Sequence, residues 1–162
     1  MTNRGHKSFD DFLAEIRDQV VEVLPWEVEH ALEGRAEGTL VVDVREESEF
    51  SKAHVMGSML VPRGILESAA DHGYEDTVAE LADGREKELI VICRSGRRSL
   101  MAAHVLQLMG FKNVKSLKGG VRGMFDSGYA LHNIWGREVP EEELDIFFYP
   151  LRKNSPVPDD MN

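Results

Sequence analysis

The chain has 162 residues, of which 42% are hydrophobic and 30% charged, and its net charge is -10. This length and composition predict one soluble globular domain and leave no room for two ordinary ones. The excess of 29 acidic over 19 basic residues argues against nucleic acid as a partner, because contacts to phosphate dominate that affinity. We expect a cytoplasmic protein without a membrane partner, since no segment resembles a secretory signal or a membrane span.

Cysteine usage limits the chemistry further. Cys93 is the only cysteine of the sequence, so an internal disulfide is excluded. The six histidines are scattered instead of grouped at ligand spacing, so we expect no metal site. A lone cysteine is usually a small buried hydrophobic residue, so the residues around Cys93 must decide whether it is reactive.

Two helices are expected before the first buried strand. Ser8 is a typical N-cap residue, and apolar residues recur at helical spacing over 9–22, which predicts an amphipathic helix. Pro25 ends this helix and begins a second, short one over 26–32. We expect residues 1–23 to form a helical extension that precedes the main domain.

Strands and helices then alternate along the chain. Residues 39–44 and 88–92 are short, almost continuously apolar runs, which is typical of strands buried on both faces. Shorter strands are expected at 59–61 and 113–117. Helices are expected at 46–51, 64–70, 74–81, 99–109 and 121–127. This order predicts an α/β layered domain with a mainly parallel sheet and right-handed crossovers.

The segment after Gly128 is expected to add little to the sheet. Residues 138–149 begin with acidic residues and end with apolar ones, which predicts an extra helix. Residues 153–162 are polar and contain proline, so we expect a disordered tail. The predicted organisation is a main domain over 24–130, followed by a C-terminal extension over 131–162.

The surroundings of Cys93 favour a reactive cysteine. A buried strand delivers Cys93 to its C-terminal end, and a helix begins after a short loop that contains Gly96. Loop amides and a helix N-terminus form a cradle for an anion, and the same field stabilises a thiolate. The residues expected to form this cradle are Arg94, Ser95, Gly96, Arg97, Arg98 and Ser99. The arginines add positive charge, and the two serines offer hydroxyl groups.

The run CRSGRRS after an apolar strand resembles the active-site loop of rhodanese-homology domains. Three more segments resemble motifs of that family, in the family's order: VDVREESEF (42–50), HVMGSMLVP (54–62) and LKGGVRGMFDSG (117–128). Ala53 stands where the family commonly has glycine, and Met124 where it commonly has tryptophan. The resemblance covers about residues 24–130 and implies a rhodanese-like three-layer α/β/α fold with extra helices at both ends.

The resemblance implies a sulfurtransferase of the single-domain rhodanese type. Cys93 would take a sulfane sulfur from thiosulfate or a low-molecular-weight persulfide, hold it as a persulfide, and pass it to a thiophilic acceptor, which could be a protein. No cofactor is implied. Arg45, just past the first buried strand, would help to position substrate or pair with a nearby carboxylate, while Asp43 and Glu49 would hold the loops. The sequence leaves the oligomeric state open.

Two other functions remain open at this point. A rhodanese-like domain can serve as a sulfur carrier or regulatory binding module without turnover. A cysteine-dependent phosphatase or arsenate reductase would also use an anion cradle, but tyrosine phosphatases place the arginine in the pattern C-x5-R, whereas Cys93 and Arg98 form C-x4-R. The shorter loop encloses a smaller site, which suits sulfur better than a phosphoryl group. An inert, buried Cys93 is the third alternative.

Overall fold

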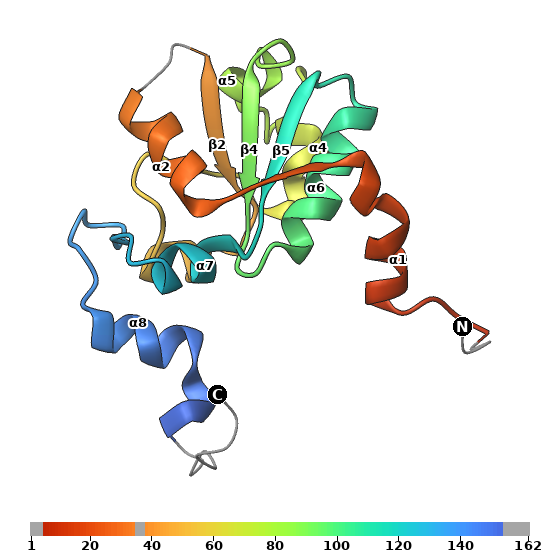
Figure 1. Cartoon of the computed structure of the whole chain (residues 1–162). Coiled ribbons are helices and arrows are strands. Elements are labelled where there is room, and N and C mark those ends of the chain that lie inside the picture. The colour runs from red at the N-terminus through yellow and green to blue at the C-terminus, as the bar shows by residue number, and fades with distance from the viewer. Residues whose placement is uncertain (1–4, 35–37, 154–162) are drawn as a thin grey trace.

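The computed structural model describes residues 5–34 and 38–153. Within these ranges the chain forms a five-stranded sheet in the order β1-β5-β4-β2-β3, and each neighbouring pair is parallel (Figure 1). The strands are β1 (Val21–Val23), β2 (Thr39–Asp43), β3 (Met59–Leu60), β4 (Glu88–Ile92) and β5 (Asn113–Leu117). The predicted α/β class with a mainly parallel sheet is therefore confirmed.

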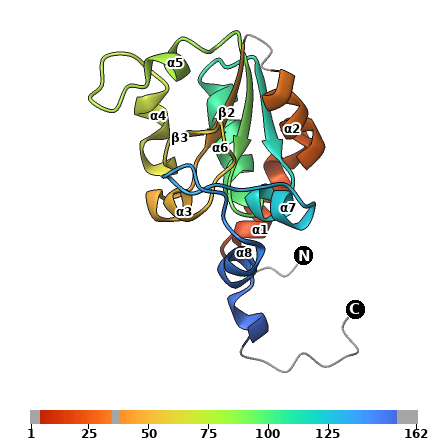
Figure 2. The ribbon, with the colours of Figure 1, turned by 90° about the vertical axis from the view of Figure 1, so that its left-hand side faces the viewer.

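Helices cover both faces of the sheet and complete the three predicted layers (Figure 2). One face carries α1 (Phe9–Ile16), α4 (Leu66–Ala69), α5 (Ala79–Ala82) and α6 (Arg97–Leu108). The other face carries α2 (Pro25–Gly34) and α7 (Gly120–Asp126). The helices α3 (Glu47–Lys52) and α8 (Glu141–Phe148) lie at the C-terminal edge of the sheet, with α3 on the opposite side from α7 and α8 further from the sheet than both (Figure 2). No helix in the described part of the chain is long and apolar enough to cross a lipid bilayer.

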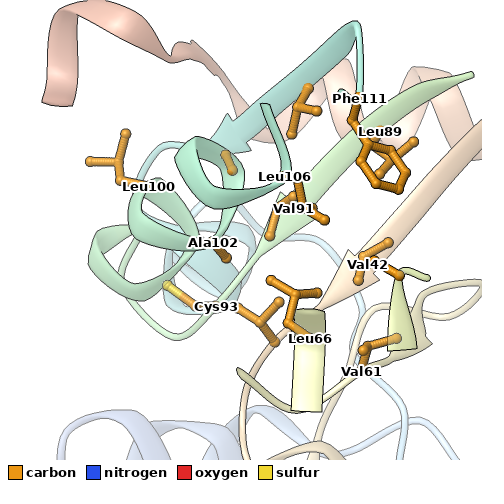
Figure 3. Packing of buried hydrophobic residues seen from close by; sticks show 14 of the residues in the cluster. Val42, Val61, Leu66, Leu89, Val91, Cys93, Leu100, Ala102, Leu106 and Phe111 are labelled. Atoms are coloured by element: carbon orange, nitrogen blue, oxygen red, sulfur yellow. The ribbon is translucent and has the colours of Figure 1, made fainter. Parts of the chain in front are cut away.

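The central strand β4 explains why the apolar run at 88–92 predicts a buried strand. Its side chains alternate between the two faces, and Leu89 and Val91 join the cluster under α1 and α6. Ile90 and Ile92 join the cluster under α2 and α7. Both faces are covered, so the four buried positions after Glu88 carry apolar side chains. Figure 3 shows the first cluster, with Cys93 packed among its members.

The N-terminal helix is shorter than predicted. Ser8 caps α1 as expected, through a capping box with Asp11, but the helix ends at Ile16 and not at residue 22. After a 3-10 turn at Arg17–Gln19, residues Val21–Val23 form the edge strand β1 and pair with β5. The prediction was wrong here because apolar residues at 20 and 23 fit helical spacing, while pairing with a distant strand decides the outcome.

Other helices also begin or end at residues that differ from the predicted ones. The helix predicted at 74–81 is reduced to α5, and the one predicted at 64–70 is a 3-10 turn, Arg63–Ile65, followed by α4. Pro140 occupies the N-cap position of α8, so this helix begins later than residue 138. A last 3-10 turn covers Pro150–Lys153. The predicted tail lies outside the described residues from position 154 onward.

Candidate active site

The C-terminal ends of the parallel strands bring three segments of the chain together. The register of β2 with β4 pairs Asp43 with Ile92, so Arg45 and Cys93 both follow strands that end at the same edge. β5 pairs with β4 on the other side and ends at Leu117, just before Gly119 and Gly120. Ligands of parallel α/β sheets bind at this edge, which makes it the candidate active site.

The backbone after Cys93 is fixed by direct contact with α7. The N–H of Val121 donates to the carbonyl of Cys93 at 2.8 Å, and the N–H of Arg122 donates to that of Arg94 at 3.1 Å. Gly120 has a φ of +63°, and a Cβ there would lie 2.4 Å from the carbonyl oxygens of Cys93 and Arg94. Only glycine lets the two backbones approach this closely.

The sulfur of Cys93 is held by groups of the loop and of α6. Cys93 is 1% exposed, and the N–H of Gly96 donates to Sγ at 3.1 Å. Gly96 has a left-handed φ of +93° and is the N-cap residue of α6, so the positive end of this helix begins beside the sulfur. The thiol donates to the Ser99 hydroxyl at 3.4 Å. Because α6 begins at Arg97, Ser99 lies in the first turn of this helix.

Ser116 joins this site although the sequence analysis did not select it. Its Oγ lies 2.8 Å from the Ser99 Oγ, and both serines are fully buried. Ser116 lies on β5 opposite Val91 of β4, two residues before Cys93. The available signal was a polar residue within a strand of a parallel sheet, where apolar residues are expected.

Arg98 interacts electrostatically with Cys93, but its guanidinium is paired with a carboxylate. Its guanidinium donates to both oxygens of Glu49 on α3, at 2.9 and 2.7 Å. Burial opposes ionisation of Glu49, but the hydrogen bonds from Arg98 and from the Glu46 N–H prevail and lower the pKa of Glu49. The same hydrogen bond raises the pKa of Arg98. The pair ties α3 to the loop of Cys93.

Arg94 points to the C-terminal extension. It donates to the carbonyls of Phe147 and Phe148 at 3.4 and 2.9 Å, and its guanidinium lies 5.7 and 5.3 Å from the centres of their rings. These carbonyls lie at the C-terminal end of α8, which favours a cation through the helix dipole. Arg94 therefore fastens α8 to the loop, and Phe148 is buried beneath it.

Arg97 makes an exposed ion pair with Asp10 of α1, at 3.4 Å. All three loop arginines thus have partners within the protein, and none presents a free charge to the sulfur in this structure. Ser95 lies in the loop and is partly exposed. The hydrogen bond that reaches Sγ from the cradle is that of the Gly96 amide.

Arg45 is buried at the end of β2 and takes the second of the two roles expected for it. Its guanidinium and backbone N–H donate to the Asp43 carboxylate, and Nη2 also donates to the carbonyl of Ala53 at 2.7 Å. Both side chains of this pair have no exposed surface. Arg45 therefore connects the end of β2 to the chain after α3. This agrees with the expected role of Asp43 in stabilising the loops.

Comparison with known proteins agrees with this geometry. The family model of the rhodanese-like domain matches residues 27–126. The protein named "Putative sulfur carrier protein YrkF" of Bacillus subtilis (strain 168) is 38% identical over 82 residues, which are 51% of this chain and 39% of that protein. Thiosulfate sulfurtransferase GlpE of Stutzerimonas stutzeri (strain A1501) is 34% identical over 97 residues, or 60% of this chain and 78% of that protein.

Solved structures share the fold. A Rhodopseudomonas palustris protein of unknown function, described as a possible tyrosine phosphatase, superposes with a TM-score of 0.71 at 24% identity, over 80% of this chain and 97% of that one. Thiosulfate sulfurtransferase of Pseudomonas aeruginosa gives a TM-score of 0.62 at 24% identity, over 78% of this chain and 22% of that one. The chain therefore belongs to the rhodanese-like domain family, among relatives named as sulfurtransferases and as a sulfur carrier.

Proposed function

We propose that this protein transfers sulfane sulfur through a persulfide on Cys93, with thiosulfate or a low-molecular-weight persulfide as donor. The observation that carries the proposal is the hydrogen bond from the Gly96 amide to Cys93 Sγ, at the point where α6 begins. An amide donor and a helix N-terminus stabilise negative charge on sulfur. The name of the GlpE relative supports thiosulfate as the donor to test first.

The chemistry consists of two substitutions at sulfur. The Cys93 thiolate attacks the sulfane sulfur of thiosulfate, the new S–S bond forms, and sulfite leaves with the electron pair of the old one. A thiophilic acceptor then attacks the outer sulfur of the Cys93 persulfide, and the Cys93 thiolate leaves. With cyanide as acceptor the product is thiocyanate. This is covalent catalysis in two half-reactions, and the charge on the protein's sulfur is the same before and after the cycle.

The residues around Cys93 have different roles in this proposal. The loop from Arg94 to Ser99 supplies backbone amides, with Ser95 at its outer side. Arg98 and Glu49 fix the position of the loop relative to α3, so that Gly96 keeps its hydrogen bond to sulfur. The buried Arg45–Asp43 pair stabilises the same edge of the sheet. In this proposal Cys93 alone forms covalent bonds to substrate.

The pairing of Arg98 disfavours the phosphatase alternative. A phosphatase arginine must bind two phosphoryl oxygens with its guanidinium. In this chain both terminal nitrogens of Arg98 are bound to Glu49, which is half-buried with it. The C-x4-R spacing points the same way. Phosphatase activity is therefore one alternative result of the experiment below. Loading of sulfur without turnover, as expected of a carrier, is another.

The decisive experiment measures the intact mass of the protein after incubation with thiosulfate, and again after cyanide is added. We expect a gain of one sulfur atom that disappears as thiocyanate forms. Cys93→Ser is the matched control, because it changes one atom in a buried position and should fold while failing to load. Loading and unloading that occur once, without multiple turnover, would indicate a carrier.

Glutathione persulfide is the second donor to test. Loading from it but not from thiosulfate would correct the donor and keep the mechanism. If neither donor loads the wild-type protein, or if Cys93→Ser still transfers sulfur, the proposal is wrong. Hydrolysis of an aryl phosphate that depends on Cys93 would replace it with the phosphatase alternative.

A further inference from the structure

We propose that Ser116 is a positioning residue for sulfur transfer, because it orients the Ser99 hydroxyl toward the charge on Cys93. The proposal rests on the proposed function and adds a residue to it. Cys93 Sγ lies 3.4 Å from Ser99 Oγ, which lies 2.8 Å from Ser116 Oγ. The two serines are fully buried, and Cys93 is 1% exposed, so bulk water does not compete for these hydrogen bonds.

The three groups form a chain whose direction depends on the charge of the sulfur. A thiol donates its hydrogen to Ser99, and Ser99 can then donate to Ser116. A thiolate has no hydrogen to donate, so Ser99 must turn its own hydrogen toward Sγ. The Ser99 oxygen is then free to accept, and the hydroxyl of Ser116 is the donor within reach. Ser116 therefore allows the chain to reverse without leaving Ser99 unsatisfied.

This reversal favours the thiolate over the persulfide. In the persulfide the negative charge lies mainly on the outer sulfur, so the inner sulfur of Cys93 accepts a hydrogen bond weakly. The thiolate is the nucleophile of the first half-reaction and the leaving group of the second. Stabilising it through Ser99 raises the fraction of reactive thiolate during loading and assists departure of Cys93 during unloading.

The charged groups at this edge of the sheet are paired with one another or with backbone carbonyls, so we expect the sulfur to be the group that changes its charge above neutral pH. These charged groups are Arg98 of α6, Glu49 of α3, Arg94 of the loop, and Asp43 and Arg45 at the end of β2. The other elements contribute uncharged groups: α4 the apolar side chain of Leu66 (Figure 3) and α7 the backbone N–H of Val121. Glu49 has a lowered pKa and Arg98 a raised one. Burial lowers the pKa of His54, which interacts electrostatically with Asp43 and Arg45. A titration between about pH 7 and pH 10 therefore reports on the sulfur.

The test compares wild type with Ser116→Ala and Ser116→Thr. Thiolate formation is followed by ultraviolet absorbance against pH, with Cys93→Ser as the blank, which is clean because the chain has one cysteine. We expect Ser116→Ala to move the midpoint up by about half to one pH unit, equivalent to about three- to tenfold less thiolate below it. Ser116→Thr keeps a hydroxyl and should restore the wild-type midpoint.

The rate at which cyanide unloads the persulfide is the second measurement. We expect Ser116→Ala to slow it by about three- to tenfold, with cooperative thermal unfolding retained. A midpoint within about 0.2 pH unit of wild type, with unloading within about twofold, would overturn the proposal. If Ser116→Ala does not fold, Ser116→Val, which also removes the hydroxyl and suits a β-strand, is judged by the same criterion. Failure of wild type to load sulfur would refute the proposed function, while the thiolate titration would still decide the role of Ser116.

Discussion

Replacing Gly120 by alanine tests whether the contact between α7 and the loop of Cys93 holds the site together. A Cβ at position 120 would lie 2.4 Å from the carbonyl oxygens of Cys93 and Arg94. These are backbone atoms, so they cannot turn aside as the end of a long side chain can. The start of α7 must move away from the loop, and the hydrogen bonds from Val121 and Arg122 to these carbonyls must lengthen or break.

The expected loss of stability in Gly120→Ala combines three contributions. A left-handed φ of +63° costs an L-residue about 1–2 kcal/mol, and two lost backbone hydrogen bonds cost about 1 kcal/mol each. The smaller conformational freedom of alanine in the unfolded chain offsets about 0.5–1 kcal/mol. We therefore expect Gly120→Ala to lower the free energy of unfolding by about 2–3 kcal/mol. Sulfur loading should fall as well, because the carbonyl that moves belongs to Cys93.

Gly119→Ala is the matched control for this substitution. Gly119 also has a left-handed φ, of +79°, but a Cβ there would lie 3.5 Å from Gly123 Cα, which is ordinary contact. Only the conformational term applies, so the expected loss is about 1 kcal/mol or less. Urea denaturation of both variants gives the comparison. Equal losses for the two variants would refute the argument that close backbone approach requires glycine at position 120.

Two further predictions concern the ion pairs Arg45–Asp43 and Arg98–Glu49. Arg45→Met should lower the free energy of unfolding by about 3–5 kcal/mol, because the buried carboxylate of Asp43 loses its partner, and Asp43→Asn in the same chain should recover part of it; a loss below about 1 kcal/mol in denaturant unfolding would contradict this. Glu49 has a folded-state pKa below its ordinary value of 4.5, so its pairing with Arg98 stabilises the fold fully above that pH and this contribution is lost as the pH falls through the lower folded-state pKa. The stability difference between wild type and Glu49→Gln, measured by urea unfolding from about pH 7 to pH 3, should therefore shrink on the acid side, and a difference independent of pH would count against the pair.

The loop arginines connect the terminal helices to the site. Arg94 binds the carbonyls at the end of α8, and Arg97 pairs with Asp10 of α1. The Arg97 pair is exposed and contributes little to stability. The Arg94 contact is partly buried and combines charged hydrogen bonds with two aromatic rings, so it is the stronger link. The C-terminal extension is thus attached directly to the residue that follows Cys93.

Much of the fold was predictable because its signals are local. The apolar runs within β2 and β4 need no knowledge of their neighbours, since a strand buried on both faces is apolar at most of its positions. Ser8 and the acidic residues after it specify the start of α1. The same holds for the site's position, because a cysteine after a buried strand, followed by glycine and a helix, lies at the C-terminal edge of a parallel sheet.

The partners of the polar residues could not be predicted in this way. Arg94, Arg97 and Arg98 look equivalent in the sequence, yet they bind α8, α1 and α3, segments that lie far from them along the chain. The edge strand β1 exists because β5 offers a ladder of hydrogen bonds, which no local preference of residues 21–23 reveals.

The sequence by itself therefore determined the class of fold, the position of Cys93 and the family of sulfur-transfer proteins to which the chain belongs. Only the tertiary structure decided that Arg45 pairs with Asp43 in the interior, and that Ser116 reaches Ser99 beside the sulfur. The physical reason is the distance along the chain over which each kind of interaction acts. Caps, turns and apolar periodicity act over a few residues, whereas buried hydrogen bonds and ion pairs depend on which distant segments the packing of the core brings into contact.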